Sequence, residues 1–83
     1  MTTLQATQPR PISSIAFAIR LHWPNVYYGA VPYLNAMDSL TTIQDTYGAE
    51  SARSIVNYFL SNAKTWKGEE ARRIKAELNA MLK

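Results

Sequence analysis

Few side chains in this sequence have the types and spacing that catalysis needs. Glu69 and Glu70 are adjacent carboxylates, the kind of pair that general acid–base chemistry uses. On a helix, however, neighbouring residues point about 100° apart, and both positions suit the positive end of the helix dipole. His22 is the one histidine and there is no cysteine, so neither a Cys–His pair nor a multi-histidine metal site can form within one chain. We therefore expect no enzymatic activity, no cofactor and no small-molecule substrate.

Basic residues offer a second kind of chemistry, which is contact with nucleic-acid phosphates. The excess positive charge lies from Lys64 onward, where basic residues outnumber acidic ones. Helical spacing pairs Glu69 with Arg72 or Arg73, and Arg73 with Glu77, which favours a solvated and nearly neutral face. The candidate nucleic-acid contacts are Arg20, His22, Lys64, Lys67, Arg72, Arg73 and Lys75.

Aromatic residues offer a third kind, which is stacking or docking. The tyrosines, together with Trp23 and Trp66, can form either a sticky patch or the rim of a small core. Tyr27 and Tyr28 are the better interface candidates, because adjacent residues in a connector cannot easily both face the core. The expected protein-interface residues are Ile15, Phe17, Ile19, Leu21, Trp23, Tyr27 and Tyr28.

The first element that must position these residues is an alternating segment. Large apolar residues alternate with small or polar ones from Ile15 to Trp23, and this period of two predicts a β-strand over about 14–23. Ile12, Ile15, Ile19 and Trp23 also have helical spacing, which leaves a helix as the alternative; the β-branched and aromatic residues favour the strand. No later segment has the pattern of a strand, so this one needs a partner in another chain.

Three helices are expected after it. Pro32 suits a first turn and predicts a helix to about Leu40, with Gly48 as a C-terminal cap of that region. Apolar residues at spacings of three and four predict a second helix over 52–63 and a third that begins near Gly68. Trp66 is expected to fill the gap between those two helices.

The predicted fold class is α+β, mainly α: one N-terminal β-strand followed by three helices, with strand pairing between chains. An all-α small helical bundle is the alternative. Residues 1–11 are expected to form a flexible N-terminal arm and residues 12–83 a single small domain. Small domains without cysteine often gain stability by oligomerisation. No export signal is visible and the apolar run is too short to span a bilayer, so we expect a cytoplasmic protein that does not contact membranes.

From about residue 25 to residue 83 the chain resembles small, largely uncharacterised proteins encoded by bacteriophages, especially those of actinobacteria. The residues that carry the resemblance are NVYYGAVPYLNAM (25–37), YGAESARSIVNYFLSNAKTWKGEEARRIKAEL (47–78) and the short basic end. The resemblance implies a protein made in the host cytoplasm during infection. It carries over no functional residue.

Two functional hypotheses follow from these patterns. The first is a non-enzymatic protein–protein interaction module, either a small homo-oligomer or an adaptor that acts on a host protein. The second is a dimeric DNA-binding repressor similar in architecture to ribbon-helix-helix proteins, in which paired strands enter the major groove. In that version Arg20 and His22, with Ala16 and Ala18, would face the DNA.

Overall fold

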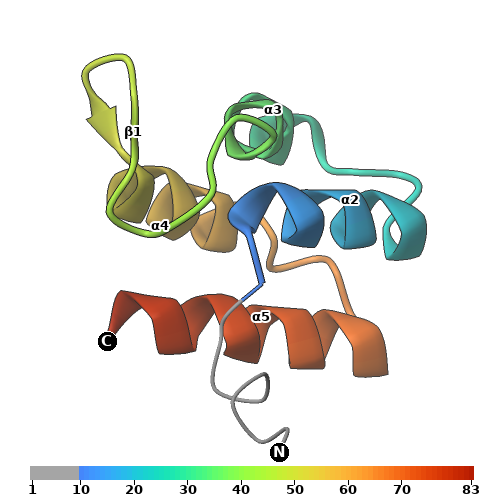
Figure 1. Ribbon diagram of the computed structural model, residues 1–83. Helices are drawn as coiled ribbons and strands as arrows, with labels where there is room; N and C mark the ends of the chain where they lie inside the picture. Colours follow the sequence, from blue (N-terminus) through green and yellow to red (C-terminus); the bar gives the residue numbers. More distant parts are fainter. Residues whose placement is uncertain (1–9) are drawn as a thin grey trace, which may run out of the picture.

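The computed structural model describes residues 10–83, which form four α-helices, one short 3₁₀-helix and a two-stranded sheet (Figure 1). The expected N-terminal arm lies outside the described residues apart from Arg10 and Pro11. The fold is mainly α with a little β, as expected, but the strands lie elsewhere. In chain order the elements are α2 (Ile12–His22), η1 (Tyr28–Ala30), α3 (Val31–Met37), β1 (Thr46–Tyr47), β2 (Glu50–Ser51), α4 (Ala52–Ser61) and α5 (Glu69–Leu82).

Helix α2 shows that the predicted N-terminal strand is wrong. The segment is helical, and Ile15, Ile19 and Trp23 are buried in the core of their own chain. Phe17 and Leu21 point the other way, with 65% and 64% of their surface exposed. The period of two arises because these two exposed apolar residues occupy positions between the buried ones. The helical spacing that the sequence also contains is the one that the fold uses.

The start of α2 is held by the loop that follows α3. The residue before the helix is Pro11, and its side chain makes no capping hydrogen bond. The N–H groups of Ile12 and Ser13 instead donate to the carbonyl oxygens of Thr41 (2.9 Å) and Leu40 (2.8 Å). Backbone donors that have no partner within the first turn are thereby satisfied by a distant part of the chain.

The two strands pair with each other rather than with a second chain. β1 and β2 are antiparallel, with Thr46 opposite Ser51 and Tyr47 opposite Glu50. Gly48 has φ +61° at the turn between them, a left-handed conformation that favours glycine. Gly48 therefore turns a hairpin and does not cap a helix. The expectation of strand pairing between chains is corrected accordingly.

The other helices lie close to their expected positions. α3 carries Pro32 in its first turn and ends at Met37, three residues before the expected end. α4 begins after Ser51, whose hydroxyl accepts a hydrogen bond from the N–H of Ser54 (3.0 Å). α5 begins after Gly68 and has two glutamates in its first turn, where the helix dipole favours negative charge.

The core is closed by an aromatic cluster. α2 and α5 run side by side in opposite directions (Figure 1), and α4 packs against α3 and α5. The rings of Trp23 and Trp66 stack with centroids 5.3 Å apart and planes within 5°, and Phe59 of α4 meets Trp23 edge-on at 6.2 Å. The indole N–H of Trp66 donates to the carbonyl oxygen of His22 (3.2 Å). Trp66 is thus buried between helices, as expected, and also joins α2 to the connection between α4 and α5.

Candidate functional site

The five tyrosines of the chain fall into two groups, one close pair and one set of three that lines a groove, and together we call them the tyrosine surface. Its members come from the segment before α3, from α3, from β1 and from α4. The rings of Tyr27 and Tyr28 lie with centroids 4.9 Å apart, and those of Tyr33 and Tyr58 with centroids 5.4 Å apart. The tyrosine surface consists of Tyr27, Tyr28, Tyr33, Tyr47 and Tyr58.

Gly29 and Asn62 connect the two tyrosine pairs. A Cβ atom on Gly29 would lie 2.6 Å from the ring of Tyr27 and 2.8 Å from the side-chain oxygen of Asn62, so both groups close on this glycine. The side-chain amide of Asn62 also donates to the carbonyl oxygen of Tyr58 (2.8 Å). Gly29 and the ring of Tyr27 therefore lie near the C-terminal turn of α4, the helix that carries Tyr58. Only glycine leaves room for this approach.

The second pair opens into a groove, which we call the tyrosine groove. Its volume is about 220 Å³. Tyr47 and Tyr58 are about half exposed there, at 48% and 50%. Among residues 10–83, Glu50 is the one charged residue in the lining, and it takes part in none of the ion pairs formed there. The groove is lined by Pro32, Tyr33, Ala36, Tyr47, Glu50, Ile55 and Tyr58.

The chemistry of this surface is that of recognition. A tyrosine ring offers a flat apolar face, and its hydroxyl offers a hydrogen bond at the wet end of the side chain. Tyrosine is enriched in protein interfaces for this reason. The described part of the chain contributes no histidine, cysteine or serine to the lining of the groove that a neighbouring base could activate as a nucleophile.

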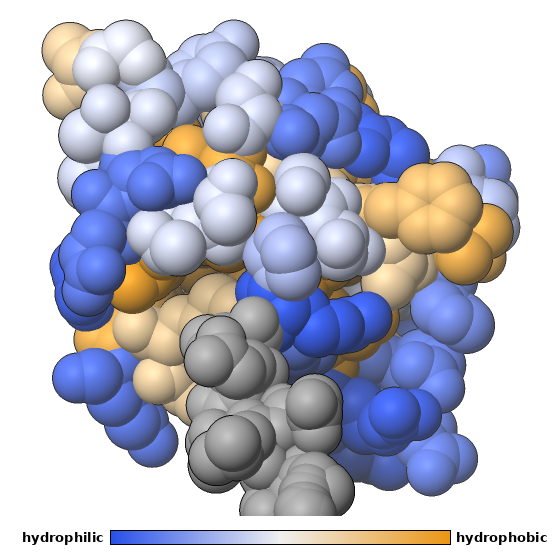
Figure 2. All heavy atoms as spheres, viewed as in Figure 1, coloured by the Kyte–Doolittle hydropathy of each residue, from blue (hydrophilic) through white to orange (hydrophobic). Residues whose placement is uncertain are grey.

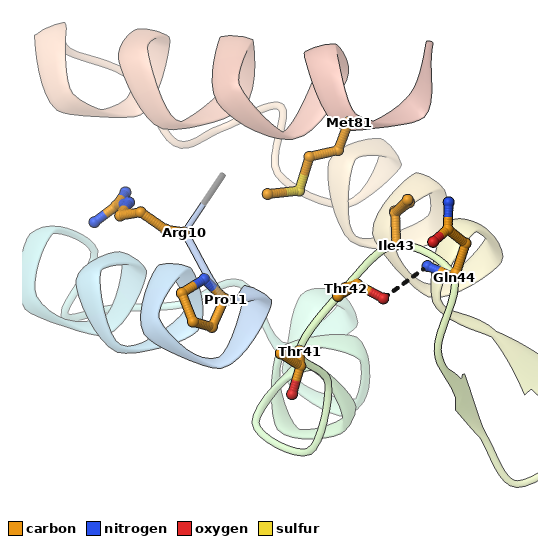
Figure 3. A pocket seen from close by; sticks show the side chains of 7 residues that line it. All are labelled: Arg10, Pro11, Thr41, Thr42, Ile43, Gln44 and Met81. Atoms are coloured by element: carbon orange, nitrogen blue, oxygen red, sulfur yellow. Dashed lines mark hydrogen bonds between the residues drawn. The ribbon is translucent and has the colours of Figure 1, made fainter. Parts of the chain in front are cut away.

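A larger cavity of about 590 Å³ lies between the start of α2, the loop after α3 and the end of α5 (Figure 3). Thr42 and Gln44 line one side of it, and Met81 of α5 lies across from them. Of the residues that the structure describes, Arg10 is the single charged one in its lining, and its guanidinium is held by both carboxylate oxygens of Glu77, at 2.9 and 2.7 Å. Within residues 10–83, the lining of this cavity includes neither an aromatic side chain nor an unpaired charge.

The residues predicted for a protein interface divide into three groups. Ile15, Ile19 and Trp23 are buried, so the expectation that they meet another chain is wrong. Phe17 and Leu21 form an exposed apolar pair, one turn apart on the outer side of α2. Figure 2 shows that apolar side chains reach the surface in several places on the face in view. Tyr27 and Tyr28 are 42% and 80% exposed and belong to the tyrosine surface.

Arg20, the main candidate for DNA contact, is engaged within the chain. Its guanidinium donates to both carboxylate oxygens of Asp38 (2.7 and 3.0 Å) and to the side-chain oxygen of Asn35 (2.9 Å). Ala16, which was expected to face the DNA beside it, is fully buried. His22 is exposed at the end of α2. A strand ribbon that presents these side chains together does not form, because the segment is helical.

The remaining basic candidates lie on α5 and in the connection before it. Arg73 pairs with Glu70 at 2.8 Å, whereas Glu77 pairs with Arg10 instead of with Arg73. The ammonium group of Lys75 donates to the carbonyl oxygen of Trp66 (2.7 Å). Partial burial, and then the charge of Lys67, lower the pKa of Lys75. The other three, Lys64, Lys67 and Arg72, are exposed.

Sequence reasoning included all five tyrosines in a possible patch but selected only Tyr27 and Tyr28 for the interface. Tyr58 carries a signal that could have been used, because it lies beside the apolar stripe of α4 rather than in it. Glu50 was missed altogether, since its position suits the first turn of a helix. Only the hairpin brings its carboxylate to the groove.

Comparisons of the chain with protein-family models, with curated proteins and with solved structures give no match. Among residues 10–83, no helix combines the length and the apolar character required to cross a membrane. Within the same residues, no three or more His, Cys, Asp or Glu side chains gather where they could hold a metal ion.

Proposed function

We propose that this protein is a non-enzymatic interaction module that docks on a partner protein through the tyrosine surface. The observation that carries the proposal is the grouping of the tyrosines into a close pair, Tyr27 and Tyr28, and a groove lined by the other three. Four of the five expose between 42% and 80% of their area. Large aromatic side chains that are half exposed and held by neighbours are the typical anchors of protein interfaces.

The proposed partner is a different protein rather than a second copy. Self-association was expected because an unpaired strand needed hydrogen bonds from another molecule, and the strands of this chain pair internally. The resemblance to actinobacteriophage proteins makes a host protein the proposed partner, with the module acting as an adaptor in the host cytoplasm. The repressor hypothesis depended on a strand that presents Arg20 and Ala16 to DNA. That segment is helical, Arg20 binds Asp38 and Asn35, and Ala16 is buried.

The test is a pull-down from actinobacterial lysate with the tagged full-length chain. We expect one partner in stoichiometric amount, and we expect the double variant Tyr28→Ser with Tyr58→Ser to lose most of it. The matched control is Phe17→Ser, which also removes an exposed aromatic ring but lies on α2. Recovery should be unchanged in that variant. If the tyrosine variant captures as much partner as the wild type, or if Phe17→Ser loses as much partner as the tyrosine variant, the proposed surface is wrong.

A photo-crosslinking residue locates the contact independently of affinity. Placed at position 28 it should crosslink the captured partner, and placed at position 17 it should not. If only the residue at position 17 crosslinks the captured partner, the interface lies on α2 and the proposed surface is wrong.

A further inference from the structure

We infer that the tyrosine groove takes an extended, proline-rich peptide that carries a basic residue. The inference rests on the proposed function, because the groove is the concave part of the tyrosine surface. It names the chemistry of the partner segment: a polyproline II helix with a lysine or an arginine beside it.

The walls of the groove suit the rings of such a peptide. Tyr33 projects from α3 and Tyr58 from α4, and their rings are tilted by 36° with centroids 5.4 Å apart. Tyr47 comes from the hairpin, so three separate elements fix the aromatic walls. Aromatic-lined grooves are the recurring sites for proline-rich segments, whose stiff conformation lowers the entropic cost of binding.

The polar groups of the groove suit the backbone of such a peptide. A polyproline II helix makes no internal hydrogen bonds, so its carbonyl oxygens remain free to accept. The hydroxyls of half-exposed Tyr47 and Tyr58 can donate to these oxygens while their rings contact the proline side chains. An α-helical ligand, by contrast, would have satisfied those carbonyls already.

The negative charge of Glu50 at the groove favours a basic residue beside the prolines of the bound peptide. Glu50 lies directly opposite Tyr47 in the antiparallel hairpin, so its carboxylate borders the aromatic walls. It takes part in no ion pair with the other described residues. A basic side chain on the peptide would supply the missing opposite charge, which contributes to specificity and to the rate of association.

The experiment uses fluorescein-labelled oligoproline peptides and fluorescence anisotropy with the full-length chain. We expect saturable binding of an oligoproline that carries one arginine, and weaker binding of the same peptide with its prolines replaced by alanine. Tyr58→Ala should weaken binding about tenfold, as expected for an interface anchor. Phe17→Ala is the matched control and should bind as the wild type does.

Glu50→Gln tests the charge separately from the fold. It should weaken binding of the arginine peptide but leave binding of a glutamine version unchanged, and this difference cannot come from misfolding. Amide resonances perturbed by the arginine peptide should map to α3, α4 and the hairpin. Perturbations confined to α2 or to α5 would overturn the inference.

The failure of this inference is distinguishable from the failure of the proposed function. If wild-type protein ignores the proline peptides but still captures a partner in a tyrosine-dependent way, the interaction module stands and the proline ligand is wrong. If the peptides bind equally well to Tyr58→Ala, the groove is not their site. If the wild-type protein neither captures a partner nor binds the peptides, both proposals are wrong.

Discussion

A single carboxylate, that of Asp45, orders the loop on which α2 depends. It accepts hydrogen bonds from the N–H groups of Thr41 (2.8 Å) and Thr42 (3.1 Å), and from the hydroxyl of Thr42 (3.1 Å). The two backbone bonds are the main causes that lower the pKa of Asp45 below its ordinary value of 3.8. Because the carbonyl of Thr41 receives the first N–H of α2, one aspartate orients both the loop and the helix start.

We expect Asp45→Asn to reduce stability at neutral pH and to flatten its dependence on pH. A carboxyl group whose folded-state pKa is lowered stabilises the fold above its unfolded pKa, and this contribution disappears as the pH falls through the folded value. The urea midpoint of the wild type should therefore fall more than that of the variant between about pH 5 and about pH 2. Amide exchange at Ile12 should be faster in the variant.

Glu50→Gln is the control for this measurement, because it removes an exposed carboxylate that has no ion-pair partner among the described residues. Amide exchange at Ile12 should be the same in this variant as in the wild type. If the urea midpoints of Asp45→Asn and of the wild type depend on pH in the same way, the carboxylate of Asp45 does not order the loop.

At the scale of elements, α4 and α5 could be predicted because their apolar stripes are uninterrupted and their flanking residues are polar. α2 could not, because the exposed Phe17 and Leu21 superimpose a period of two on its helical spacing. Its first turn also lacks a capping side chain, since distant carbonyls satisfy its donors. The hairpin has strands of two residues each, which are too short for an alternating pattern to exist.

Two substitutions on α2 should have very different effects on stability. Ile19→Ala removes a fully buried side chain and should cost about 2–5 kcal/mol of unfolding free energy. Phe17→Ser alters an exposed position and should change it by about 0.5 kcal/mol or less, with the helical circular dichroism signal retained. Urea titrations compare the two directly. If the two variants lose similar amounts of unfolding free energy, both side chains pack on the same side, as the strand hypothesis required.

For the whole molecule, the tyrosine surface shows what a sequence alone leaves open. The residue type allowed either a sticky patch or the rim of a small core, because tyrosine suits the boundary between apolar and wet surroundings. The meeting of Tyr33 with Tyr58 depends on how α3 packs against α4, and that of Tyr47 with both depends on the hairpin. Neither spacing nor composition specifies these tertiary contacts. Trp23 and Trp66, grouped with the tyrosines by type, are instead buried.

We expect the free protein to sediment as a monomer at micromolar concentration. Its strands pair internally, and the apolar pair Phe17 and Leu21 is small beside the roughly 800 Å² per partner of a standard stable interface. Sedimentation velocity measures this directly. A dimer that Tyr28→Ser with Tyr58→Ser dissociates would place a second copy on the tyrosine surface and contradict a different protein as the partner.

The stacked indoles of Trp23 and Trp66 have an optical consequence. Both rings are buried and stacked in a fixed arrangement, with centroids 5.3 Å apart, so they should contribute a near-ultraviolet circular dichroism band that disappears when this tertiary packing is lost. Trp23 follows α2 and Trp66 precedes α5, so that band exists only while these two parts of the chain are packed together. The protein therefore contains its own label-free reporter of the native state, built from residues outside the tyrosine surface.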